Sequence, residues 1–183
     1  MNYNFRKEFK YTWLVVPIDG TKEFLKKNGQ FTVNIGLCRD GVPIFGIVSI
    51  PTSNEIYYGI ENLGSFKIEN TGEIKKLKIN KKDFTQKNMN IIASLSHMND
   101  DTKKYIEQFT TPNLMNIGSS MKLLYIAENK ADVYPRYALT SEWDTCAAHA
   151  VVKYAGGKVF IAETRQELIY NKENILNPYF LVY

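Results

Sequence analysis

The feature that most constrains the fold is a pair of β-rich segments joined by a strong turn signal. Phe31–Leu37 alternates Phe, Val and Ile with Thr, Asn and Gly, and Val42–Ile50 is again rich in β-branched and aromatic residues. Asp40-Gly41 lies between them, and an Asp-Gly pair between two such runs is typical of a tight β-hairpin. The sequence therefore predicts an antiparallel sheet in the first part of the chain.

Further strand-like segments extend this sheet on both sides. They are Thr12–Val16, which Pro17 closes, then Glu55–Ile60, Gly64–Ile68 and Lys75–Ile79. The bend at Asn62-Leu63-Gly64 predicts a second hairpin. The first half is thus expected to be almost entirely β-structure.

The second half alternates strands with helices. The expected strands are Asn90–Leu95, Leu114–Ile117, Ala131–Tyr134 and Lys158–Ile161, and the expected helices are Asp100–Phe109, one around Met121–Glu128, and Thr145–Ala155, which Gly156-Gly157 ends. A strand-rich first half followed by a second half in which strands and helices alternate predicts an α+β fold or a layered α/β/α/β fold. We expect one domain over residues 1–183, with a strand-rich half (1–82) and an α/β half (83–183).

Composition excludes several classes of protein. An apolar fraction of 44% supports a packed core, and a net charge of +4 with no dense Lys/Arg run argues against a nucleic-acid polymer as partner. No segment approaches a membrane span or a signal peptide. The two cysteines, Cys38 and Cys146, have no metal-ligand spacing, which predicts buried free thiols in a reducing compartment and a cytoplasmic protein.

Two acidic residues stand where a divalent metal site could form. Asp19 follows the first strand and precedes Gly20-Thr21, and Asp144 precedes Thr145 at an expected helix start. A carboxylate and a loop carbonyl suit a hard cation, and the amides of a helix start suit an anion. The alternative for each aspartate is a plain helix cap, which needs no function.

Two further sites carry weaker signals. Gly118-Ser119-Ser120, with Lys122 close behind, is a small-residue turn of the kind that holds anions. His97, in the Ser94–His97 segment, is a single histidine at a strand end, a position that is more often structural than functional.

Taken together, these segments resemble one family. WLVVPIDGTKEF is similar to the W-x-V-D-P-I-D-G-T-x-E-F signature of the inositol-monophosphatase superfamily. NGQFTVNIGL, DGVPIFGIV, SLSHMND, IGSSMKLLYIAENKADVYPRY, EWDTCAAHAVVKYAGGKV and LNPYFLVY follow in the family order and resemble its bisphosphate nucleotidase (CysQ-type) branch. The resemblance spans Tyr11 to Tyr183, nearly the whole chain.

The resemblance implies a layered α/β/α/β sandwich and a Mg²⁺-dependent 3'-phosphatase of adenosine 3',5'-bisphosphate, an enzyme of sulfur metabolism. It implies Asp19, Asp144 and the carbonyl of Ile18 as metal ligands, and Thr21 and Asp19 as catalytic residues. It also implies substrate contacts from Gly20, Thr21, His97, Gly118 and Lys122. The implied partner is a small nucleotide bisphosphate, and the implied location is the cytoplasm, with peripheral membrane association as an alternative.

Two departures from the family pattern predict impaired turnover. Val16 stands where the signature has a metal-bridging Asp, and the N-terminal region of relatives, with a metal-binding Glu and a water-activating Asp/Thr pair, has no counterpart here. Alternatives are a phosphatase of inositol or sugar phosphates and a non-catalytic, truncated remnant that binds nucleotide. An uncovered N-terminal face predicts self-association.

Overall fold

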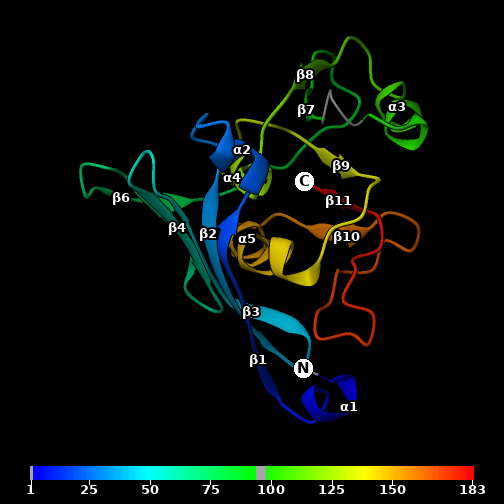
Figure 1. Ribbon diagram of the computed structural model, residues 1–183. Coiled ribbons are helices and arrows are strands. Elements are labelled where there is room, and N and C mark those ends of the chain that lie inside the picture. Colours follow the sequence, from blue (N-terminus) through cyan, green and yellow to red (C-terminus); the bar gives the residue numbers. More distant parts are fainter. Residues whose placement is uncertain (1, 94–97) are drawn as a thin grey trace.

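A six-stranded antiparallel sheet dominates the first part of the computed structural model, which describes residues 2–93 and 98–183 (Figure 1). Its strands lie in chain order, β1-β2-β3-β4-β5-β6. They are β1 (Tyr11–Asp19), β2 (Thr32–Arg39), β3 (Val42–Ile50), β4 (Glu55–Ile60), β5 (Gly64–Ile68) and β6 (Ile74–Leu77). Short helices precede and follow β1, namely α1 (Tyr3–Arg6) and α2 (Thr21–Leu25). The expected hairpins are confirmed: β2 pairs with β3, and β4 with β5.

Helix α5 (Glu142–Tyr154) packs across one face of this sheet. The contact is so close that the facing strand positions have no room for a side chain. A Cβ added at Gly46 would lie 2.1 Å from the carbonyl oxygen of Ala147, and one at Gly59 would lie 2.4 Å from that of Ala150. Glycines on neighbouring strands therefore set the distance between the helix and the sheet.

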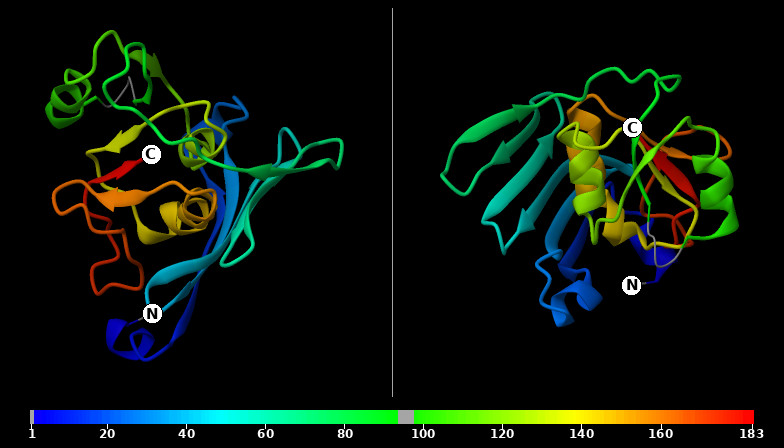
Figure 2. Two further views of the ribbon diagram at one scale, coloured as in Figure 1. Left: turned by 180° about the vertical axis from the view of Figure 1, so that it is seen from behind. Right: turned by 90° about the horizontal axis from the view of Figure 1, so that it is seen from above.

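A smaller layer lies on the far side of α5, as the views in Figure 2 show. It holds a three-stranded sheet in the order β10-β11-β9 and a parallel pair, β7-β8. The strands are β7 (Asn90–Ile92), β8 (Asn113–Met115), β9 (Tyr134–Arg136), β10 (Val159–Ile161) and β11 (Phe180–Val182), with helices α3 (Asp100–Ile106) and α4 (Met121–Ala127). This sheet–helix–sheet layering confirms the expected α/β sandwich.

Several expected boundaries are wrong. The first strand does not stop at Pro17 but runs to Asp19, because β1 is an edge strand where proline costs little pairing. The register shifts between Val16 and Asp19, so Pro17 and Ile18 have no paired partner in β2. Phe180–Val182, which the sequence did not mark as a strand, is the central strand of the small sheet.

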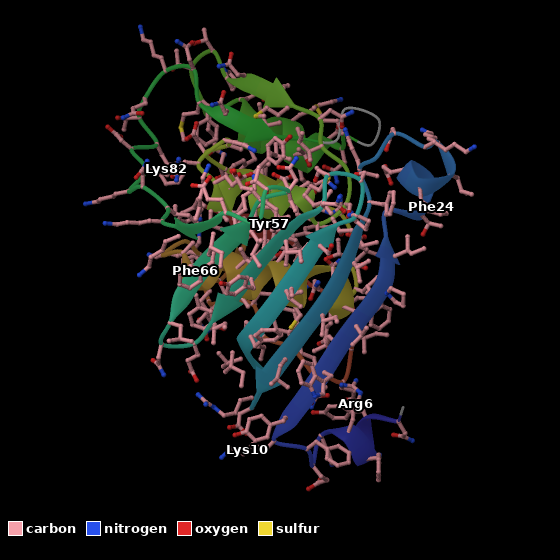
Figure 3. All side chains as sticks on the ribbon, turned by 90° about the vertical axis from the view of Figure 1, so that its left-hand side faces the viewer. Arg6, Lys10, Phe24, Tyr57, Phe66 and Lys82 are labelled. Carbon is pink, nitrogen blue, oxygen red and sulfur yellow. The ribbon has the colours of Figure 1, made fainter. Side chains whose placement is uncertain are left out.

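The second face of the large sheet is apolar and open. On β1 the exposed fractions of Tyr11, Trp13 and Val15 are 53%, 59% and 53%. Paired residues continue this apolar surface across the sheet, for example Val15, Ile35, Ile47, Tyr58 and Phe66 in one row from β1 to β5. Figure 3 looks onto this face, with the strands in front and α5 behind them. We call these outward-facing residues of β1–β5 the open sheet face.

Candidate functional site

Asp19 occupies the end of β1, where the chain turns into α2. Gly20 makes this turn with φ of +87°, a left-handed conformation that glycine adopts without strain. A Cβ at position 20 would also lie 3.0 Å from the carbonyl oxygen of Gln30. The backbone beside Asp19 is thus held in one narrow geometry.

The turn before α4 holds the Asp19 carboxylate. Its Oδ2 accepts hydrogen bonds from Ser119 Oγ at 2.6 Å, from Ser120 N at 2.7 Å and from Ser120 Oγ at 2.7 Å. The Gly118-Ser119-Ser120 turn therefore contacts Asp19 directly, across 100 residues of sequence. All three hydrogen bonds are accepted by Oδ2, so they fix the orientation of the Asp19 carboxylate through one of its two oxygens.

Asp144 approaches the same region from the first turn of α5. The alternative reading of Asp144 as a plain N-cap is wrong: Ser141 is the N-cap, and Asp144 is the third helical residue, whose Oδ2 accepts the Ser141 amide at 2.8 Å in a capping box. Burial raises the pKa of Asp144, the Ser141 bond opposes this, and the nearby negative charge of Asp19 adds to the rise. Two carboxylates close enough to repel each other are the arrangement that a bound cation stabilises.

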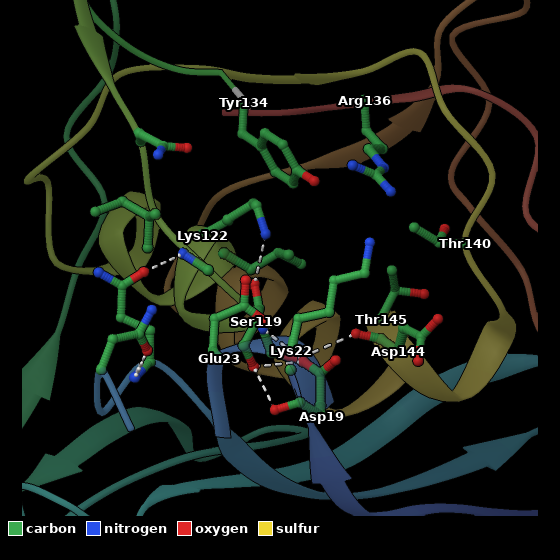
Figure 4. A pocket seen from close by; sticks show the side chains of 18 of the residues that line it. Asp19, Lys22, Glu23, Ser119, Lys122, Tyr134, Arg136, Thr140, Asp144 and Thr145 are labelled. Atoms are coloured by element: carbon green, nitrogen blue, oxygen red, sulfur yellow. Dashed lines mark hydrogen bonds between the residues drawn. The ribbon is translucent and has the colours of Figure 1, made fainter. Parts of the chain in front are cut away.

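These residues line a cavity of about 660 Å³ (Figure 4). It brings together five residues expected from the sequence: Asp19, Gly20, Gly118, Lys122 and Asp144. Thr21 is exposed, and it, Val16 and Ile18 do not line the cavity. His97 lies outside the described residues.

A cationic wall faces the two carboxylates. Lys22, Lys122 and Arg136 all point into the cavity in Figure 4. The pKa of Lys122 is lowered to about 8, chiefly by burial and then by the positive charge of Arg136, while the negative charge of Asp19 opposes both. The Nη2 of Arg136 donates to the carbonyl oxygen of Leu139 at 3.1 Å, and its buried Nε has no hydrogen-bond partner among the described residues.

Reasoning from the sequence missed Lys22, Arg136 and the serine bonds to Asp19. Lys22 lies inside the Asp19–Phe24 segment, and Arg136 directly follows the strand expected at Ala131–Tyr134. The available signal was the position of each basic residue beside an expected site or strand end. Only the tertiary fold shows that Lys22 and Arg136 face the same cavity.

The donor set fits one hard cation. Asp19 and Asp144 supply carboxylate oxygens to the cavity. Ile18, whose carbonyl was expected as a further ligand, lies in the stretch of β1 that does not pair with β2, outside the cavity lining. No cluster of three His, Cys, Asp or Glu side chains suited to a metal occurs within residues 2–93 and 98–183. Val16 offers no oxygen, so the set is one carboxylate short of the family signature.

The layered fold, with a cavity in which two carboxylates face three basic side chains, is shared with a known family of proteins. The chain belongs to the inositol monophosphatase family, whose model matches residues 4–179. The 3'(2'),5'-bisphosphate nucleotidase CysQ of Buchnera aphidicola is 42% identical over 160 residues, and CysQ of Escherichia coli K12 is 38% identical over 177 residues. The crystal structure of CysQ from Bacteroides thetaiotaomicron, 37% identical, superposes with a TM-score of 0.90.

The similarity covers this chain more fully than it covers its relatives. The match to the Buchnera protein covers 86% of this chain and 58% of that protein. The match to the E. coli protein covers 97% of this chain and 70% of that protein, and the match to the Bacteroides structure covers 100% of this chain and 73% of that one. The chain thus spans somewhat more than half to about three quarters of these relatives. None of the helices in the described ranges has the length and apolarity to cross a membrane.

Proposed function

We propose that this chain carries a Mg²⁺-dependent phosphatase site of the bisphosphate nucleotidase type, which takes adenosine 3',5'-bisphosphate. The observation that carries the proposal is the cavity in which Asp19 and Asp144 face Lys22, Lys122 and Arg136. Carboxylates suit the cation, and basic side chains suit a substrate with two phosphate groups. The names of the CysQ relatives support the same substrate class.

Each group has a role that its position supports. Asp19 and Asp144 would hold Mg²⁺, which when bound supplies charge neutralisation for the scissile phosphate and a more acidic water. Lys122 and Arg136 bind and orient the second phosphate. Ser119 and Ser120 keep the Asp19 carboxylate aimed at the cavity through their bonds to Oδ2.

The same residues support weak turnover. Val16 replaces a carboxylate of the family signature, and an apolar side chain raises the cost of holding adjacent dications. We therefore propose that the chain binds nucleotide more effectively than it hydrolyses it. This makes a non-catalytic nucleotide-binding module the second candidate, with Val16 as the observation that favours it.

A phosphate-release panel with binding measurements tests these proposals. The substrates are adenosine 3',5'-bisphosphate, inositol 1-phosphate and fructose 1,6-bisphosphate, each with Mg²⁺ and with a chelator; titration calorimetry measures binding in parallel. We expect nucleotide binding with little phosphate release. Robust hydrolysis of all three substrates would overturn the substrate assignment, and absence of nucleotide binding would overturn both candidates.

We also propose that the chain self-associates through the open sheet face. Large contiguous apolar surfaces on isolated chains drive association. Trp13 and Val15 are each more than half exposed on an edge strand, which adds unpaired backbone groups to the apolar surface. A second copy that covers this face would bury both.

A further inference from the structure

The two cysteines of the chain lie against each other in the core. Cys38 on β2 and Cys146 on α5 are 108 positions apart in sequence, yet their Sγ atoms are 3.2 Å apart. Both are free thiols, with exposed fractions of 1% and 0%. The proposed phosphatase chemistry uses neither of them.

Close packing holds the thiols in this position. A Cβ at Gly36, two residues before Cys38 on the same face of β2, would lie 2.6 Å from Cys146 Sγ. The glycine therefore makes room for the Cys146 side chain, and the short helix–sheet distance brings it to Cys38. A disulfide bond is about 2.05 Å long, so the sulfurs need to approach by only roughly 1.2 Å.

We propose that Cys38 and Cys146 form a redox modification site, at which a small peroxide converts the dithiol to a disulfide that ties α5 to β2. One thiol reduces the peroxide, takes up one oxygen as a sulfenic acid and releases water. The second thiol attacks that sulfur, the S–S bond forms and a second water leaves. In sum, two thiols and one hydrogen peroxide give one disulfide and two waters.

The disulfide has a defined structural consequence. It closes a long loop between residues 38 and 146, which removes much chain entropy from the unfolded state. It also anchors the first turns of α5, two residues beyond Asp144. We expect the oxidised chain to unfold at a temperature higher by roughly 10 °C, and dithiothreitol to reverse this shift.

Mass spectrometry of the intact, folded chain after peroxide treatment is the primary test. We expect a monomer that has lost 2 Da, apart from the mass added by oxidised methionines, with no titratable thiol after unfolding and a non-reduced peptide that links Cys38 to Cys146. The five methionines report whether oxidant was delivered, because each adds 16 Da when oxidised. These readings need no variant and no enzymatic activity, so they are independent of the proposed function.

Cys38→Ser is the matched control, and we expect it to keep one thiol or gain oxygen, without the 2 Da loss or the reversible thermal shift. Two titratable thiols in a chain whose methionines are oxidised would overturn the proposal. So would sulfinic acid at one cysteine with the other free, or a disulfide that lowers the unfolding temperature.

Discussion

Val16→Asp tests whether one missing carboxylate limits metal binding at this site. Val16 pairs with Asn34 across β1 and β2, and the Asn34 amide donates to Ser120 Oγ, which in turn bonds Asp19. The oxygen Oδ1 of Asn34 is buried without a hydrogen-bond partner among the described residues. A carboxylate at position 16 would therefore enter a polar cluster beside Asp19.

The size of the effect follows from charge. At a separation of about 4 Å and an effective dielectric constant near 20, one unit charge pair is worth about 4 kcal/mol. Lost hydration and the repulsion from Asp19 and Asp144 offset much of this. We expect a net gain of about 2 kcal/mol in the free energy of Mg²⁺ binding, or roughly thirtyfold in affinity. Without metal the third carboxylate should destabilise the fold by a similar amount, roughly 4–8 °C in Tm.

Calorimetric titration with Mg²⁺ and thermal unfolding with and without Mg²⁺ measure both effects. Val16→Asn is the matched control, because the Asn amide has nearly the shape of the Asp carboxylate without its charge. The variant Val16→Asp should lose stability in chelator and regain it in Mg²⁺, whereas the stability of Val16→Asn should not depend on Mg²⁺. Equal Mg²⁺ affinity in both variants and the parent would refute the argument that position 16 faces the metal site.

Three further outcomes follow from the site and the sheet. Lys122→Ala should weaken nucleotide binding by about one to two orders of magnitude in calorimetry; unchanged affinity would remove Lys122 from the phosphate site. Because Lys122 is cationic below its pKa of about 8 and neutral above it, nucleotide affinity in the parent should fall between pH 7 and pH 9, and Lys122→Ala should lose most of this dependence. Trp13→Lys with Val15→Lys should convert an associating chain to a monomer in sedimentation at little cost in stability, since both side chains are exposed; a parent chain that is already a monodisperse monomer would contradict the proposed self-association.

The sequence predicted most accurately those strands whose ends are set by local turn chemistry. Strands β3, β4 and β5 begin and end where they were expected. Asp40 and Gly41 both have positive φ, 51° and 79°, as a tight hairpin turn requires. The information for these boundaries lies within a few residues of each turn.

Features set by distant partners were not predictable in this way. Phe180–Val182 is a strand that β9 and β10 flank. The short aromatic and apolar run after Pro178 was the available signal, but only the fold shows which strands it pairs with. The last long helix was expected to begin at Thr145, yet α5 begins at Glu142, and Ser141 rather than Asp144 is its N-cap. The structure shows that Asp19, Gly118, Lys122 and Asp144 line one cavity. The metal-binding and substrate-binding roles of these residues stay predictions.

The distance between Asp19 and Asp144 depends on how helix α5 packs against the large sheet. Asp19 ends a strand of the large sheet, and Asp144 lies in the first turn of α5, so their separation is set by how closely α5 lies on that sheet. That closeness rests on Gly46, where a Cβ would meet the Ala147 carbonyl oxygen at 2.1 Å. A Gly46→Ala change would push the helix outward, and the carboxylate of Asp144 would move with it. Because backbone contacts of this kind yield little, the geometry of the proposed metal site is a consequence of core packing as much as of the residues that line the cavity.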